Sequence, residues 1–164
     1  MSASIYTYII ELQYLGFRYS GWQVQKDVKT IQYMLDRTLK FIYEDKIKIK
    51  SLGSSRTDRM VSAMSFHCEI FCDQILDIDD LFLNLEKNLP ADIRVIKAFP
   101  IDKNFQIIHP SHQKEYIYCF SYGKKAHPYS APFIYNSLEK LDIDLMKIAC
   151  KLFEGKHFFK KSLS

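Results

Sequence analysis

Hydrophobic residues along this chain follow two different periods, and the period changes several times. In the N-terminal part, stretches that alternate or are rich in Ile, Tyr and Val are separated by stretches whose apolar residues recur every three or four positions. Alternation indicates strands, and recurrence at three and four indicates amphipathic helices. The pattern therefore predicts strand, helix, strand, strand, helix and strand, at residues 5–14, 31–43, 47–52, 63–71, 77–89 and 93–99.

Local signals mark the ends of both predicted helices. Thr30 is a good N-cap for the first helix. Acidic residues from Asp77 to Asp80 suit the positive end of the second helix, and Pro90 ends it. The order of elements is the ferredoxin-like βαββαβ pattern, an α+β fold in which an antiparallel sheet carries its helices on one face.

The remainder of the chain begins a second set of elements. Residues 115–122 alternate as a strand, residues 127–136 contain prolines and read as a loop, and Asp142 caps a helix whose apolar residues we expect to be buried. One strand and one helix do not complete a domain. We therefore expect a ferredoxin-like domain at residues 1–103 and the beginning of a second, similar α+β domain at residues 104–164, as in a fragment or a truncated gene product.

Composition limits the class of protein. The chain has 164 residues, of which 48% are hydrophobic and 26% charged, and this is typical of a globular protein rather than a disordered one. The net charge of +4 is compatible with a polyanionic partner such as nucleic acid, although it does not require one.

Cysteine and histidine spacing argues against a metal site. The four cysteines form no pair of Cys-x-x-Cys motifs and the five histidines show no ligand spacing, so we expect reduced thiols and no bound metal. Apolar runs are shorter than a membrane span, and the N-terminus lacks the pattern of a signal peptide. These features predict a cytoplasmic protein that does not enter the membrane.

A polar triplet, Arg56-Thr57-Asp58, lies between the strands predicted at 47–52 and 63–71. In extended backbone, residues two apart point to the same side, so Arg56 can hold the carboxylate of Asp58 ionised. An ionised and positioned carboxylate can act as a covalent nucleophile or a general base. The alternative is an ion pair that only shapes a turn, and the triplet alone does not distinguish the two.

Five further blocks accompany this triplet in a fixed order. They are Gly21-Trp22-Gln23-Val24-Gln25, Thr30-Ile31-Gln32, Asn88-Leu89-Pro90-Ala91-Asp92-Ile93, Lys114-Glu115-Tyr116-Ile117-Tyr118 and Phe153-Glu154-Gly155-Lys156-His157-Phe158. In order and spacing the whole set resembles the TruA-type tRNA pseudouridine synthases, and the resemblance covers the first half and the opening of the second half of that family.

The resemblance implies an active site and a substrate. Asp58 would be the catalytic aspartate, Arg56 its basic ion-pair and positioning partner, and Tyr116 the active-site tyrosine near the target base. The substrate would be uridines in the anticodon stem-loop of tRNA, with no cofactor, and the protein would be a homodimer. Whether the carboxylate attacks the sugar or removes its 2′ proton stays open.

The same resemblance implies contacts with RNA. Trp22 would stack on a base, although a tryptophan in a glycine-bounded loop can equally be a packing anchor, and Gln23 beside it can equally be a hydrogen-bonding loop residue. The RNA-binding residues expected on this basis are Arg59, Trp22, Gln23 and Lys114.

Two positions depart from the family, which typically reads Gly-Arg-Thr-Asp-Ala-Gly-Val-His-Ala around the triplet. Met60 replaces a glycine that would permit positive φ or close backbone approach. Ile108 stands where the family typically has an arginine, which removes a cation from an expected backbone contact.

Because of these two departures, two functions other than catalysis stay open for this protein. One is a catalytically impaired paralogue that binds structured RNA without modifying it, and the other is a ferredoxin-like protein-interaction module with no role in RNA. Salt-sensitive tRNA binding separates the two alternatives, and turnover that depends on Asp58 separates the enzyme from both.

Overall fold

The computed structural model describes residues 5–108 and 113–157. The chain divides into two compact units, Met1–Lys114 and Glu115–Ser164, and each is described by itself. The predicted domain boundary between residues 103 and 104 stays a prediction. Within the described residues, no helix is long and apolar enough to cross a membrane.

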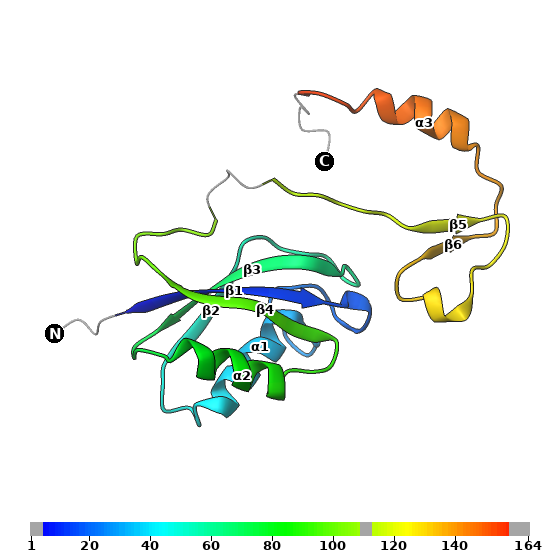
Figure 1. The fold of residues 1–164 in the computed structure, drawn as a ribbon. Helices are drawn as coiled ribbons and strands as arrows, with labels where there is room; N and C mark the ends of the chain where they lie inside the picture. Colours follow the sequence, from blue (N-terminus) through cyan, green and yellow to red (C-terminus); the bar gives the residue numbers. More distant parts are fainter. Residues whose placement is uncertain (1–4, 109–112, 158–164) are drawn as a thin grey trace. The chain divides into compact units, whose positions relative to one another are not determined.

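The first unit is a four-stranded antiparallel sheet with two helices on one face (Figure 1). Its strands stand in the order β2-β3-β1-β4, which is the ferredoxin-like arrangement, so the predicted fold class is confirmed. In chain order the elements are β1 (Tyr6–Tyr14), the short 3₁₀ helix η1 (Gly16–Arg18), α1 (Ile31–Ile42), β2 (Ile49–Gly53), β3 (Ala63–Cys72), α2 (Ile78–Asn88) and β4 (Ile93–Ile101).

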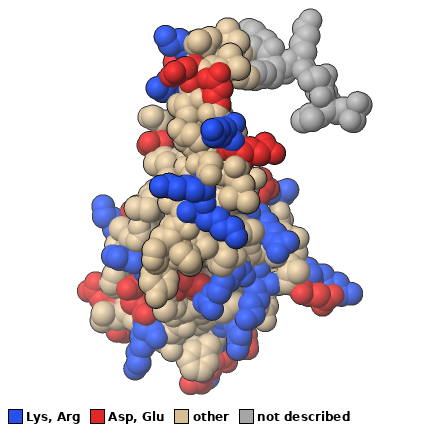
Figure 2. All heavy atoms as spheres, turned by 90° about the vertical axis from the view of Figure 1, so that its right-hand side faces the viewer, with Lys and Arg blue, Asp and Glu red and all other residues tan. Residues whose placement is uncertain are grey.

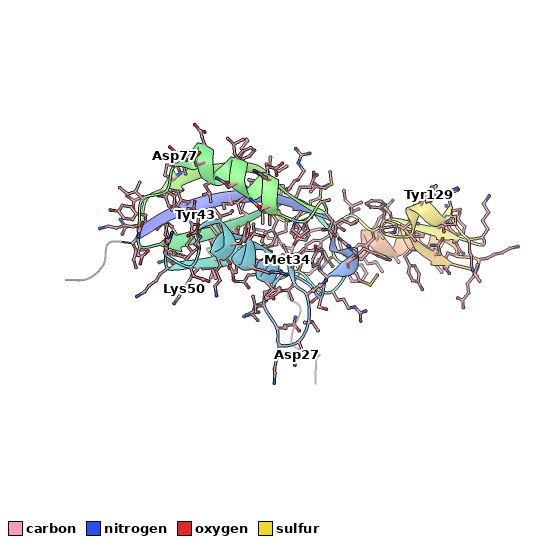
Figure 3. The ribbon with its side chains drawn as sticks, turned by 90° about the horizontal axis from the view of Figure 1, so that it is seen from below. Asp27, Met34, Tyr43, Lys50, Asp77 and Tyr129 are labelled. Atoms are coloured by element: carbon pink, nitrogen blue, oxygen red, sulfur yellow. The ribbon has the colours of Figure 1, made fainter. Side chains whose placement is uncertain are left out.

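Side chains cap the start of both helices: Thr30 caps α1 as predicted, and Asp77, one of the acidic residues expected at the start of α2, caps that helix. The Thr30 side chain accepts a hydrogen bond from the backbone of Tyr33 at 3.2 Å, and the Asp77 carboxylate accepts one from Asp80 at 3.0 Å. From the helix side, Figure 3 shows α1, labelled at Met34, lying beside α2 across the sheet. The core between these layers contains the fully buried residues Ile10, Leu12, Ile31, Leu35, Leu39, Ile70, Leu81 and Leu85.

The opposite face of the sheet contains a buried carboxylate. Glu69 in β3 is only 1% exposed, and the side chain of Ile107, which is 2% exposed, belongs to the segment that follows β4. The backbone N–H of Ile107 donates to Oε2 of Glu69 at 3.4 Å, whereas Oε1 has no hydrogen-bond partner among the described residues. Burial raises the pKa of Glu69, because the charged form loses hydration that this one weak hydrogen bond does not replace.

Glu69→Gln is therefore expected to stabilise the first unit near neutral pH. Below the pKa of an unfolded Glu, both states hold the proton and the group has no effect. As pH rises, the unfolded state releases its proton first, so the free energy of unfolding of the wild type falls until the raised folded pKa is passed. Because Gln has no proton to lose, we expect the variant to become more stable than the wild type as pH rises through this range.

Urea unfolding can be followed by the fluorescence of Trp22, the only tryptophan of the chain. A stability difference between the two proteins that stays constant with pH would contradict the prediction.

The second unit differs more from its prediction. Its elements are β5 (Phe120–Tyr122), η2 (Pro128–Ser130), β6 (Tyr135–Ser137) and α3 (Ile143–Lys151), and β5 pairs with β6 in parallel. The strand expected at 115–122 is wrong for its first five residues, because only residues 120–122 pair as a strand with β6. Asp142 caps α3 as expected, accepting from Leu145 at 2.9 Å. The apolar residues of α3 are not buried, contrary to the prediction: Ile148, for example, is 63% exposed.

Candidate active site

The connection between β2 and β3, residues 54–62, brings three of the predicted site residues together. Arg56, Asp58 and Arg59 all lie in it, and all three are exposed. The backbone carbonyl of Asp58 accepts a hydrogen bond from the N–H of Val61 at 3.3 Å, which closes a tight turn directly after the carboxylate. The carboxylate of Asp58 therefore stands at the start of a turn, on the outside of the molecule.

The segment around η1 holds this connection in place. Trp22 donates its backbone N–H to the carbonyl of Thr57 at 3.1 Å, and Met60 donates to the carbonyl of Tyr19 at 3.1 Å. These two hydrogen bonds lie on either side of Asp58, so its backbone is fixed from both directions.

Two side-chain hydrogen bonds add to this support. The N–H of Gly16 donates to the hydroxyl of Ser62 at 2.9 Å, and the hydroxyls of Tyr14 and Thr57 lie 3.1 Å apart. Burial raises the pKa of Tyr14 to about 12, so its hydroxyl stays protonated and remains able to donate.

Two glycines allow this close approach of backbones. A Cβ on Gly16 would lie 1.9 Å from the carbonyl oxygen of Val61, and a Cβ on Gly21 would lie 2.3 Å from that of Thr57. Gly21 also has a φ of +84°, which side-chain-bearing residues rarely adopt. The Gly-Trp block and the Arg-Thr-Asp triplet, distant in sequence, are thus two sides of one packed contact.

Trp22 is a packing anchor and not an exposed base-stacking ring, which corrects its prediction as an RNA contact. Its side chain is 2% exposed and packs against Phe66 with the ring centroids 4.3 Å apart. Gly53 leaves room for the indole, since a Cβ there would lie 2.4 Å from Nε1 of Trp22. The neighbouring Gln23 is exposed, so it remains available for a ligand.

Gln32, the last residue of the Thr-Ile-Gln block, connects two segments of the candidate site through its side chain. Its side-chain carbonyl accepts from the N–H of Val24 at 3.1 Å, and its amide donates to the carbonyl of Ser51 at 2.9 Å. One side chain therefore ties the loop after Trp22 to β2, the strand that leads into Asp58.

The ion pair predicted between Arg56 and Asp58 is not formed. Among the described residues, no salt bridge within 4.0 Å involves either side chain. Residues 56–58 belong to no strand, and the two side chains do not form the contact that the sequence suggested. Both charged groups are consequently free to meet an external ligand.

Met60 adopts a backbone conformation that glycine accommodates more easily than other residues. Its φ is +66°, in the left-handed region, and its side chain is 47% exposed. The strain expected from the sequence is thus present at the third position of the Asp58–Val61 turn, where glycine is usual when φ is positive.

Met60→Gly is expected to raise the free energy of unfolding by about 1 kcal/mol. A non-glycine residue in this region costs about 1–3 kcal/mol, which the larger chain entropy of glycine offsets only in part. Met60→Ala is the matched control, because it removes the side chain but keeps the Cβ that causes the strain. Equal stabilities of the Gly and Ala variants in urea unfolding would show that the strain is not the cause.

Tyr116 and Lys114 do not belong to the connection between β2 and β3. Tyr116 belongs to the second unit and is 66% exposed, and Lys114 is an exposed residue at the end of the first unit. Their roles beside Asp58 therefore stay predictions.

Sequence reasoning did not single out Asp92, which lies behind the cluster. Its carboxylate accepts from Arg18 and from the hydroxyl of Tyr19. Asp92 belongs to the block from Asn88 to Ile93 that carries the family resemblance, but its place between Pro90 and the strand from Ile93 suggested only a solvated turn.

No group of three or more His, Cys, Asp or Glu side chains able to hold a metal ion occurs in the described parts of the chain.

The curated proteins to which this chain is similar include several that are named tRNA pseudouridine synthase A. The chain is 30% identical over 155 residues to tRNA pseudouridine synthase A 1 of Protochlamydia amoebophila, which covers 94% of the chain and 60% of that protein. It is 32% identical over 144 residues to tRNA pseudouridine synthase A of Thermodesulfovibrio yellowstonii (88% and 56%), and 33% identical over 156 residues to that of Thermosipho melanesiensis (93% and 62%). The chain spans about three fifths of the length of these relatives. No protein-family model matches it.

Proposed function

Because the chain belongs to the family of TruA-type tRNA pseudouridine synthases, we propose that it isomerises uridine to pseudouridine in tRNA, with Asp58 as the catalytic carboxylate. The observation that carries this proposal is the setting of Asp58. Its carboxylate is exposed and has no ion-pair partner among the described residues, while the backbone around it is fixed by the segment from Tyr14 to Trp22. A free acidic group on a fixed backbone suits catalysis by positioning.

The reaction needs an acidic residue at the sugar of the target nucleotide. The bond between C1′ and N1 must break, the base must turn, and a new bond must form between C1′ and C5. Asp58 serves this chemistry either by attacking C1′ or by removing the 2′ proton, and both routes begin from the ionised carboxylate. Tyr116 would lie against the base and take part in proton transfer.

The target base has to leave its stack, which costs a few kcal/mol that contacts to RNA must offset. Arg56 and Arg59, exposed on either side of Asp58, suit contacts with phosphates next to the target nucleotide. Figure 2 shows Lys and Arg side chains on the surface of the first unit, interspersed with Asp and Glu. Gln23 and Lys114 complete the proposed RNA-binding set.

The resemblance supports further proposals about the substrate and the assembly. We propose that the target uridines lie in the anticodon stem-loop, and that the protein acts in the cytoplasm as a homodimer without a cofactor.

Mapping of pseudouridine tests the proposed substrate. The protein expressed from its complete reading frame would be incubated with unmodified tRNA, and pseudouridines would be located by carbodiimide modification and primer extension. The proposal predicts new stops in the anticodon arm. Stops only in another arm, or none, would contradict it.

A catalytically impaired RNA-binding paralogue is the second candidate. The observation that favours it is Ile108, which is 65% exposed where the family typically carries an arginine. In that case tRNA would bind with a steep dependence on salt, as phosphate contacts require, but no pseudouridine would form.

A further inference from the structure

Asp92 lies in the turn between α2 and β4, far in sequence from the triplet. Its side chain is 10% exposed, and both carboxylate oxygens are occupied. Oδ2 accepts from Nε and from a terminal nitrogen of Arg18 at 2.9 and 2.7 Å, and Oδ1 accepts from the hydroxyl of Tyr19 at 2.7 Å. The backbone carbonyl of Asp92 also accepts from Leu15 at 2.9 Å. One residue therefore holds the η1 segment at three of its positions.

The same segment reaches Asp58 from its other side. The carbonyl of Tyr19 accepts from Met60 at 3.1 Å, and the N–H of Gly16 donates to Ser62 at 2.9 Å. A chain of contacts thus runs from Asp92 through Tyr19 to the backbone two residues after Asp58. The segment around η1 is held between a buried carboxylate and the proposed catalytic turn.

The Tyr19 hydroxyl keeps the proton that it donates to Asp92 at neutral pH. The Tyr19 side chain is 4% exposed, and burial together with its hydrogen bond to Asp92 raises the pKa of its hydroxyl. The hydroxyl therefore stays protonated and donates to Asp92. Without that acceptor, a buried hydroxyl would lose its partner and the segment would have to move to satisfy it.

We propose that Asp92 is a positioning residue for Asp58, acting through Tyr19 and Arg18 on the backbone of the catalytic turn. The proposal rests on the proposed function of Asp58. Asp92 touches no reacting atom, so its loss affects the chemical step through the placement of the Asp58 carboxylate. Displacement of a catalytic group by about 1 Å can cost about a hundredfold in rate.

Asp92→Ala is the main test, made in the protein expressed from its complete reading frame. We expect kcat for pseudouridine formation to fall by about ten- to a hundredfold, while the Kd for tRNA changes by less than about twofold, because no proposed RNA contact is removed. Asp92→Asn should recover most of this loss, since its side-chain carbonyl can still accept from Tyr19. Tyr19→Phe removes only the hydroxyl and should lower kcat in the same direction.

Asp77→Ala is the matched control for lost stability. Asp77 is also an aspartate beside α2, but it caps the opposite end of that helix, and its carboxylate accepts from Asp80 within the same helix (Figure 3). Loss of the Asp77 side chain should lower the free energy of unfolding of the first unit. It breaks none of the hydrogen bonds that connect Asp92 with the turn after Asp58, so kcat should stay within about twofold of wild type. An equal fall of kcat in Asp77→Ala and Asp92→Ala would overturn the proposal.

Hydrogen exchange at single amides separates this proposal from the proposed function. In Asp92→Ala and in Tyr19→Phe, we expect the amide of Met60 to lose protection, while amides in the middle of β1 keep theirs. This readout does not need catalysis. An inactive wild type with the expected exchange pattern would contradict the proposed function alone, whereas unchanged protection at Met60 or unchanged kcat in an active enzyme would overturn the role of Asp92.

Discussion

Replacing Asp58 by Asn is expected to abolish pseudouridine formation while leaving the affinity for tRNA within about twofold. Asn has the same shape as Asp, so the turn that begins at residue 58 should be kept. The amide can neither attack C1′ nor accept the 2′ proton, so both routes open to the carboxylate are lost. Loss of an essential catalytic group costs on the order of 10⁴-fold in rate.

Single-turnover assays followed by nucleoside chromatography measure this effect. Asp27→Asn is the matched control, because Asp27 is also an exposed aspartate, with a φ of +61°, in a loop that extends away from α1 (Figure 3). The control should keep the wild-type rate. Pseudouridine formation at more than about a tenth of the wild-type rate by Asp58→Asn would show that another group performs the chemistry.

Gly21→Ala is expected to destabilise the first unit by about 3 kcal/mol and to lower kcat as well. The new Cβ would lie 2.3 Å from the carbonyl oxygen of Thr57, which is backbone and cannot swing away. The φ of +84° adds strain that alanine cannot relieve. Overpacking and left-handed backbone each cost about 1–3 kcal/mol. The contact that would be forced apart is the one that fixes the residue before Asp58.

Urea unfolding followed through Trp22 reports this loss directly, because Trp22 adjoins Gly21 and is buried. Gly123→Ala is the control, since Gly123 also has a positive φ, of 73°, but a Cβ added there would meet nothing within 4 Å. Gly123 lies in the second unit, so we expect the control to leave the Trp22 transition of the first unit unchanged. A loss below about 1 kcal/mol for Gly21→Ala would contradict the packed contact.

The hydrophobic pattern was sufficient for the architecture of the first unit. The predicted order of elements and the Thr30 cap are confirmed, and β1 and α1 differ from their predicted ranges by a single residue at one end. The pattern failed at 115–122, where alternation is present but only residues 120–122 pair as a strand with β6. Periodicity reports which residues can form a strand, whereas a strand also needs a neighbour.

From the sequence, the residues of the candidate site could be predicted, but the contacts and burial of their side chains could not. Asp58 was recognised from the residues around it, but its free carboxylate was not, because the expected pairing with Arg56 assumed extended backbone. Trp22 was ambiguous in sequence, since burial depends on Phe66 and Gly53, which belong to other elements. Asp92 could not be recognised because its partners are more than seventy residues earlier in the chain.

The burial of the Glu69 carboxylate could not be predicted from the sequence either. Alternation along β3 places Glu69 on the face away from the helices, where a charged residue normally meets water. Ile107 covers that position, and no local pattern predicts that a segment after β4 will fold back over β3.

Release of tritium from tRNA labelled at C5 of uridine tests the central claim most directly. Formation of pseudouridine expels the hydrogen at C5, so release reports the reaction itself. With the protein expressed from its complete reading frame, we predict release that matches the pseudouridine formed and that vanishes in Asp58→Asn. Salt-sensitive binding of tRNA without any release of tritium would contradict the account and would favour an RNA-binding paralogue.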